Sequence, residues 1–332
     1  MNQYDPQRLR EFFWQFAERD RWTGGPDTHL AMIAEMNQAH EFIDQAWLAG
    51  CYVAPYNVTT GYRIYEAWPV ERMRTGAEGL EAWLTEHWAG LSVRTERRAV
   101  RTPQKLSRHL LSYFQWADNV LPTLVGQHWE PAYAYRAVWD SAKENVWGAG
   151  RYALLKLLET FERTGWEIAI PDIRPVGGDS PRKMLATLYD PDLATGNDAE
   201  TLDKIAACVD HLRAEGEARG VSLSMFNTEV YLCEFLQAMK KNQYPGRALD
   251  SELGHYRKVS DDFGEWPEFF ELRERMFPEW ALGEKQGWTG RRKELGECLP
   301  IHGYMWSDRL YDYKATEEPA RPVEKVQALP AI

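Results

Sequence analysis

The sequence lacks the features that mark a membrane-spanning, secreted or zinc-binding protein. No apolar run approaches the roughly 20 residues of a membrane span, and the beginning, "MNQYDPQRLREFF", lacks the basic and then apolar order of a signal peptide. The few cysteines are far apart and have no C-x-x-C spacing, which indicates neither a disulfide framework nor a zinc site. They are Cys51, Cys208, Cys233 and Cys298. We therefore expect a cytoplasmic protein with no membrane partner.

Positive charge is also in short supply, because 39 Lys and Arg face 50 Asp and Glu and the formal net charge is -11. The overall charge argues against a general polyanion binder, although local patches decide contact. One basic stretch, "SVRTERRAVRTPQKLSRHL" at 92–110, stands out and predicts either phosphate contact or a solvated helix face. Its cations are Arg94, Arg97, Arg98, Arg101, Lys105 and Arg108, against Glu96.

The spacing of apolar residues predicts an all-α protein. Apolar residues recur every three or four positions, as in Leu154, Leu158 and Phe161, and proline repeatedly follows a residue that favours a helix start. These pairs are Asp5-Pro6, Thr102-Pro103, Glu130-Pro131, Ser180-Pro181 and Asp190-Pro191. The predicted helices span 6–19, 27–49, 77–89, 103–117, 131–146, 150–163, 181–188, 199–219, 223–241, 250–260 and 267–276. Two short runs, 51–58 and 166–172, resemble strands.

A glycine-containing turn separates two of these helices in "NVWGAGRYALLKLLE" at 145–159. Gly148 and Gly150 allow a sharp turn and a close approach of the backbone to another group. The N–H groups at the start of the following helix have no partner within that helix, so they favour an anion. The motif therefore predicts either a plain helix–helix turn or a hairpin that binds a DNA phosphate through Trp147, Gly148, Gly150 and Arg151.

"WGAGRYALLKLLE" resembles the helix-hairpin-helix of DNA glycosylases. In those enzymes a catalytic aspartate follows the hairpin on an extended segment, and here Asp172 follows Gly150 by 22 residues in "IAIPDIRP". A structural role for Asp172 in a cap or loop is the alternative. Tyr152 stands in the region where lyase-type glycosylases carry a Schiff-base lysine, so the resemblance does not imply β-lyase chemistry.

Four further segments resemble the α-glutamyl/putrescinyl thymine pyrophosphorylase family, which are bacteriophage amino acid:DNA transferases. They are "WLAGCYVAPYNVTTGYRIYEAWP" (47–69), "GGPDTHL" (24–30), "NQYPGRALDSELGHYR" (242–257) and "LGEKQGWTGRR" (282–292). The resemblance implies a helix-hairpin-helix, glycosylase-like fold of two packed helical lobes. It also implies transfer of an amine, from an amino acid such as glycine or glutamate or from putrescine, onto 5-pyrophosphoryloxymethyl-uracil in double-stranded phage DNA, in the host cytoplasm. We expect one catalytic domain over 1–315, with the hairpin at 145–152, and a mobile tail at 316–332.

Such a reaction needs a pocket for a flipped base and cations around the leaving group. Tyr56, Asn57 and Thr59 are the candidate pocket residues, with Asn57 placed to read a uracil edge; their alternative role is to cap the next helix. Lys240, Lys241 and Arg247 surround a Pro-Gly turn and are the candidate pyrophosphate ligands, or else a solvated helix end. The sequence has no spacing of ligand residues that requires a metal ion. Mg²⁺ is nevertheless compatible with a pyrophosphate substrate, and the carboxylates of Asp250 and Glu252 could bind it.

The attacking amine must lose a proton, which calls for a carboxylate or imidazole base. The candidates are Asp172, Glu229, Glu234 and His255. The leading hypothesis is therefore a thymine-hypermodifying transferase that contacts DNA through the hairpin and through Arg97, Arg98 and Arg101. A monofunctional glycosylase that uses Asp172, and a DNA-binding module without chemistry, are the alternatives.

Overall fold

The computed structural model describes residues 6–20, 25, 27–94, 97–125, 129–171, 179–239, 247–277 and 282. Within these residues every regular element is helical and no strand occurs, so the predicted all-α class is confirmed. The tail at 316–332 lies outside the described residues. The chain divides into two compact units. Unit 1 comprises Met1–Thr28, Asp172–Asp250 and Glu271–Ile332, and unit 2 comprises His29–Pro171 and Ser251–Phe270.

Unit 1 is built around an aromatic cluster. Its described helices are α1 (Pro6–Asp20), α12 (Asp179–Leu188), η4 (Pro191–Ala194), α13 (Ala199–Ala218) and α14 (Met225–Met239). Phe13 of α1 meets Phe235 of α14 edge to face at 5.5 Å, and Phe16 lies 5.8 Å from the same ring. All three rings are fully buried. Helix α12 packs against both α1 and α14 and closes this core.

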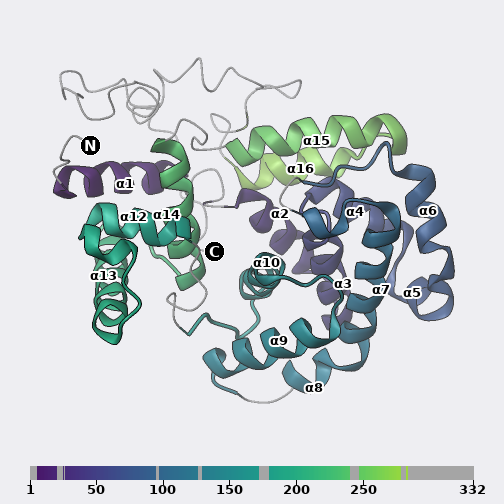
Figure 1. Cartoon of the computed structure of the whole chain (residues 1–332). Helices are drawn as coiled ribbons and strands as arrows, with labels where there is room; N and C mark the ends of the chain where they lie inside the picture. Colours follow the sequence, from purple (N-terminus) through teal and green to yellow (C-terminus); the bar gives the residue numbers. More distant parts are fainter. Residues whose placement is uncertain are drawn as a thin grey trace. The chain divides into compact units, whose positions relative to one another are not determined.

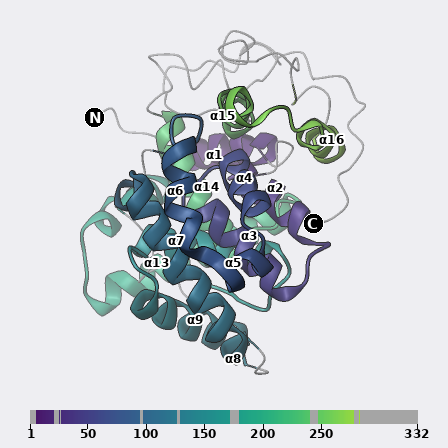
Figure 2. The ribbon, with the colours of Figure 1, turned by 90° about the vertical axis from the view of Figure 1, so that its right-hand side faces the viewer.

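Unit 2 is built around a central helix that is buried along most of its length. Its elements are α3 (Phe42–Val53), α4 (Val58–Ala67), α5 (Val70–Gly76), η2 (Ala77–Gly79), α6 (Leu80–His87), η3 (Arg98–Val100), α7 (Pro103–Asn119), α8 (Leu121–Val125), α9 (Pro131–Asn145) and α10 (Arg151–Arg163). Helix α3 packs against α4, α7 and α10. Figure 1 shows these four helices near one another, and the turned view of Figure 2 shows α3 beside α4 and α7. Helices α2 (Thr28–Asn37), α15 (Arg247–Phe263) and α16 (Pro267–Met276) each contain a boundary between the units.

Proline marks the start of several helices as predicted. The Thr102 hydroxyl accepts the Lys105 N–H and Pro103 is the first residue of α7, while Pro131 opens α9. Asp190 caps the short helix η4, which begins at Pro191. The expectation for Ser180-Pro181 is wrong, because α12 already begins at Asp179.

The prediction of one helix over 27–49 is also wrong, because the chain breaks between α2 and α3. The Asn37 amide donates to the Gln45 carbonyl oxygen at 3.1 Å, and the Gln45 amide donates to the carbonyl oxygens of Asn37 and His40. These side chains satisfy backbone groups that a continuous helix would have paired internally. The break therefore depends on local side-chain hydrogen bonds and not on the apolar pattern.

Neither predicted strand forms. Residues 51–53 complete α3 and Val58 begins α4, so the apolar run at 51–58 spans a helix end, a turn and a helix start. All eight of these residues are buried, and burial on every side removes the periodicity that separates a helix from a strand. In the second run, residues 166–171 are irregular, and the Trp166 ring stacks on Phe161 at 4.0 Å. Helices α5 and α8 were not predicted, and α4 was expected only as the helix that Asn57 and its neighbours would cap.

None of the helices in the described part of the chain is both long and apolar enough to cross a membrane.

Candidate functional site

The glycine motif forms a tight turn between α9 and α10, as predicted. Gly148 adopts a φ of 72°, which lies in the left-handed region that glycine reaches without strain. Gly150, with an ordinary φ of -81°, is the N-cap residue of α10. The first turn of α10 contains no acidic residue, so the unpaired N–H groups of this helix end are not neutralised from within the turn.

Helix α7 holds the turn in place through two polar contacts with Trp147. The Trp147 N–H donates to the Ser112 hydroxyl at 2.9 Å, and its carbonyl oxygen lies 2.6 Å from His109 Nδ1. Because a carbonyl oxygen can only accept, Nδ1 must carry the proton of the imidazole. Burial, together with the nearby charge of Arg97, lowers the pKa of His109 to about 4, and the hydrogen bond to Trp147 offsets this only in part. His109 is therefore a neutral positioning group at physiological pH.

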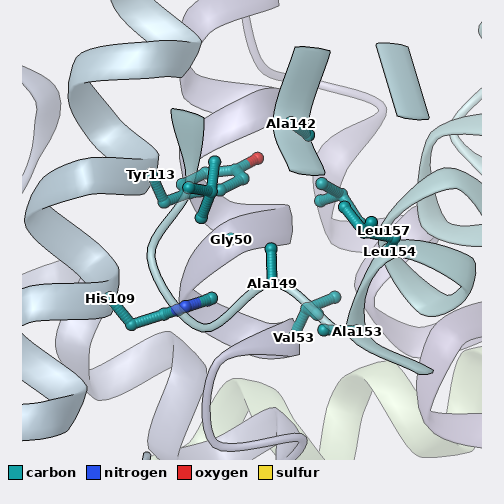
Figure 3. Close-up of a pocket in the computed structure, with 10 residues that line it drawn as sticks. Gly50, Val53, His109, Tyr113, Ala142, Ala149, Ala153, Leu154 and Leu157 are labelled. Atoms are coloured by element: carbon teal, nitrogen blue, oxygen red, sulfur yellow. The ribbon is translucent and has the colours of Figure 1, made fainter. Parts of the chain in front are cut away.

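A small apolar cavity lies beneath the turn. Figure 3 shows His109 and Tyr113 of α7 on one side, Leu154 and Leu157 of α10 on the other, and Ala149 of the turn between them. The cavity volume is about 10 Å³, which corresponds to roughly one water molecule. This cavity is a packing defect and is too small for a nucleobase.

The basic stretch at 92–110 lies directly beside the hairpin. A Cβ atom built on Gly148 would be 3.7 Å from both the Ala99 Cβ and His109 Nδ1. The Arg108 guanidinium lies over the Trp147 ring, 4.7 Å from its centroid. The exposed cations around this turn are Arg101, Lys105, Arg108 and Arg151. Two segments that sequence analysis singled out separately therefore form one surface, which we call the hairpin surface: residues 98–108 and 147–151.

Arg97 differs from the other cations of the stretch because it is buried, with only 4% of its surface exposed. Its Nε donates to the Ala54 carbonyl oxygen at 3.0 Å, while Nη2 has no hydrogen-bond partner in the described chain. Burial lowers the pKa of Arg97 to about 10, partly offset by the phenols of Tyr152 and Tyr56. Arg97 therefore does not belong to the exposed hairpin surface. No side chain is described for Arg98.

Tyr56 connects the turn after α3 to the start of α10. Its ring meets the Tyr152 ring edge to face at 5.3 Å and the His29 ring at 4.9 Å. Its φ of 55° is uncommon for a residue with a side chain and costs roughly 1–2 kcal/mol. Surrounding contacts must hold this conformation, and the Arg94 guanidinium, 5.6 Å from the ring centroid, is one of them.

The predicted pocket residues Asn57 and Thr59 are fully buried. The Asn57 side-chain oxygen accepts the Thr60 N–H at 2.8 Å, so Asn57 caps α4, which is the alternative that its sequence context left open. Its amide nitrogen lies 3.5 Å from Glu252 Oε2. Both ends of the Asn57 amide are therefore engaged within the fold.

Glu252 organises the interior beside Tyr56. Its carboxylate accepts from Arg94 Nη2 at 2.8 Å and from the Val58 N–H at 3.2 Å, and it is fully buried. Burial opposes ionisation, but the neighbouring Arg94 guanidinium is the main group that outweighs it and holds the pKa of Glu252 below its ordinary value. Glu252 is thus an ionised partner of Arg94. Among the described residues no group of three or more His, Cys, Asp or Glu side chains is arranged to hold a metal ion.

His255, a predicted base, lies on the same helix as Glu252. Its Nδ1 is 3.0 Å from the Ser92 hydroxyl, and the Ser92 N–H donates to Thr60 Oγ1. Burial lowers the pKa of His255, and Glu252 opposes that effect only in part. The imidazole is therefore neutral near pH 7 and able to accept a proton.

Not every predicted site residue joins this group. Glu229 is buried on α14 in unit 1, and Glu234 lies on the same helix. Arg247 is exposed at the start of α15. Asp172, Lys240 and Lys241 lie outside the described residues.

Sequence reasoning did not assign a role to Ser92 or His109. Both occur inside the basic stretch, but the contacts that define them join residues 163 and 38 positions apart. Ser92 precedes the cations and His109 sits on an amphipathic helix, so a local pattern gives no signal for either contact.

The observed class is an all-helical protein with a glycine hairpin beside a basic segment and a buried ionic network. The chain matches no protein-family model, and comparison with curated proteins and with solved structures gives no match either.

Proposed function

We propose that this protein modifies thymine in DNA, as a transferase that replaces the pyrophosphate of 5-pyrophosphoryloxymethyl-uracil with an amine. The resemblance of its segments to thymine pyrophosphorylases motivates the proposal. The observation that carries it is the convergence of the glycine hairpin and the basic stretch into one hairpin surface. This convergence supports the expectation that a helix-hairpin-helix core binds a DNA phosphate.

The hairpin surface has the chemistry that a DNA backbone requires. Arg101, Lys105, Arg108 and Arg151 are exposed, and the α10 N-terminus adds backbone donors that favour an anion. Trp147 is held by α7 and stacked under Arg108, which fixes the donors before DNA binds. The chain as a whole is acidic, with a formal net charge of -11, so a local group of exposed cations is where a duplex would be attracted.

The proposed chemistry needs a base for the incoming amine. Heterolysis of the bond between the exocyclic carbon and the pyrophosphate oxygen releases pyrophosphate, and the amine nitrogen then forms the new bond to that carbon and gives up one proton. His255 is the described candidate for that proton, because its imidazole is neutral and Ser92 fixes its orientation. Asp172, the other candidate from the sequence, lies outside the described residues.

The test is nucleoside mass spectrometry. The protein is incubated with DNA that carries 5-pyrophosphoryloxymethyl-uracil and with a mixture of amino acids and polyamines, after which the DNA is digested. One new thymidine adduct with released pyrophosphate supports the transferase and identifies the amine. Loss of the base with abasic sites would instead establish the glycosylase, and unchanged nucleosides with tight duplex binding would leave a binding module.

Two variants separate DNA binding from chemistry in this assay. Gly148→Val should weaken duplex binding, because a β-branched side chain is strained at a φ of 72°. The matched control is Gly165→Val, which puts the same side chain at a φ of 99° beyond the other end of α10 and should bind the duplex like the wild type. Asp172→Asn should bind the duplex normally and lose turnover. Full activity of Asp172→Asn would return Asp172 to a structural role.

A further inference from the structure

Arg97 carries a buried positive charge that the described chain does not neutralise. Its neighbour Arg94 is paired with Glu252 at 2.8 Å, and His109 is neutral because its pKa is lowered to about 4. No carboxylate is paired with Arg97 in the described residues, where its guanidinium makes one hydrogen bond, to the Ala54 carbonyl oxygen. Because an isolated buried charge is costly, this arrangement calls for an anion.

The surroundings of Arg97 fit an oxyanion. Nη2 is enclosed and has no hydrogen-bond partner in the described chain. The Nε bond ties Arg97 to Ala54, two residues before Tyr56, and the Tyr56 ring meets the Tyr152 ring of α10 at 5.3 Å. Tyr152 belongs to the first turn of α10, where backbone N–H groups are unpaired within the helix and no acidic residue is present. At the N-cap, a Cβ built on Gly150 would meet nothing within 4 Å, so this helix end is open.

We infer that Arg97 anchors a binding site for a small phosphate-class oxyanion, formed together with the first turn of α10. The planar guanidinium provides charge and paired donors, and the helix end provides further N–H groups. This inference stands on the burial and hydrogen bonding of Arg97, so it does not depend on the transferase proposal.

The alternative role for Arg97 is structural, through the bond from Nε to the Ala54 carbonyl at the end of α3. The two roles predict opposite changes in Arg97→Gln. Relief of an unneutralised charge should raise the melting temperature of the anion-free variant above that of the wild type. Loss of a structural contact should lower the melting temperature and leave the effect of an added anion unchanged.

The experiment is calorimetric titration with inorganic pyrophosphate at ionic strength held constant with sodium chloride. The wild type should bind, and Arg97→Gln should bind roughly tenfold more weakly or worse. Arg136→Gln, which removes an exposed arginine of α9, is the matched control and should bind like the wild type. Arg97→Lys keeps the charge without the planar fork and should fall between the two.

Absence of pyrophosphate binding to the wild type overturns the inference, even if every Arg97 variant fails to fold. Equal binding by the wild type and Arg97→Gln overturns it as well. A duplex oligonucleotide identifies the source of the oxyanion. If Arg97→Gln weakens duplex binding by the same factor, the ligand is a strand phosphate; if duplex binding is unchanged, the site takes a free or base-borne phosphate group.

Discussion

The aromatic cluster of unit 1 and the hairpin region of unit 2 are stabilised in different ways. By the hairpin region we mean the turn at 146–150, residues 97–109, and the α3–α4 turn with Glu252 and its partner Arg94. In unit 1, Phe13, Phe16 and Phe235 contact one another ring to ring. In the hairpin region, buried contacts join charges and polar groups, as between Arg94 and Glu252 or His109 and Trp147.

The difference bears on where function lies. Apolar packing stabilises a fold without regard to pH, whereas buried ions contribute little net stability relative to apolar groups of the same size. The hairpin region contains a buried unpaired cation, a tyrosine at positive φ and an ionised buried carboxylate. It is therefore less stable than apolar packing of the same size would make it. Such departures concentrate at functional sites. The comparison therefore favours the hairpin region over the aromatic cluster as the candidate site.

The largest effect should come from the aromatic cluster. Phe235→Ala removes a fully buried ring and should cost about 3–5 kcal/mol of unfolding free energy, because the cavity cannot refill. Urea unfolding measures the loss, and faster amide exchange in α14 locates it. The cost should be the same at pH 7 and pH 5, since no ionisable group is involved. Tyr133→Ala, at an exposed tyrosine, is the control and should change stability by under about 0.5 kcal/mol.

In the hairpin region, Glu252→Gln should come next. The substitution keeps the shape of the side chain and leaves Arg94 without its counter-charge, which should lower the free energy of unfolding by about 3 kcal/mol. This value is at the lower end for a buried pair because the Arg94 side chain is 18% exposed. Because the pKa of Glu252 is depressed, the wild type has this stabilisation above pH 4.5 and loses it as pH falls through the folded-state pKa. Urea titrations at several pH values test both statements.

The control for that variant is Glu200→Gln, which breaks an exposed ion pair with Lys204 on α13. We expect no measurable change, because exposed pairs are solvated and screened. If Glu252→Gln lowered the free energy of unfolding no more than Glu200→Gln, the buried ionic network would not contribute to stability. The proposed difference between the two regions would then be wrong.

The free energy of unfolding should depend on pH through His109, which lies in the hairpin region and has no counterpart in the aromatic cluster. Its pKa falls from 6.5 to about 4 on folding, so the unfolded chain binds more protons between these values and stability decreases as the pH falls. Between pH 7 and pH 5 the loss is about 2 kcal/mol. His109→Asn, which keeps a donor for the Trp147 carbonyl, should remove this slope. An identical slope in wild type and variant would show that other groups cause it.

Sequence patterns predicted the elements around the hairpin well, because the signals are local. Proline after Thr102 and Glu130 marks the starts of α7 and α9, and glycine marks the turn before α10. The break before α3 was missed because it depends on amides of Asn37 and Gln45 that bond to backbone carbonyls. A periodicity argument cannot detect such bonds.

The candidate site was predicted only as separate pieces. Arg97 and Arg101 occur in one basic run, yet the first is buried and the second exposed. The backbone between them forms only the short turn η3 (Arg98–Val100), which is too short for a periodic pattern to separate the two residues. The partner of Arg94 is 158 residues away in sequence. Long-range pairing of this kind is set by tertiary packing, so the sequence could propose the cations but could not assign their partners.

The smallest expected effect comes from the two hairpin glycines. Gly148→Ala should cost about 1 kcal/mol, because alanine is strained at a φ of 72°; the Cβ itself would meet its neighbours at an ordinary 3.7 Å, so the cost is conformational and not steric. Gly150→Ala has a φ of -81° and open space, and should be neutral or slightly stabilising, because alanine restricts the unfolded chain. Urea unfolding of both variants measures the difference. Equal costs would mean that the turn is not held by the conformation of Gly148, and that the contacts of His109 and Ser112 with Trp147 alone fix the hairpin against α7.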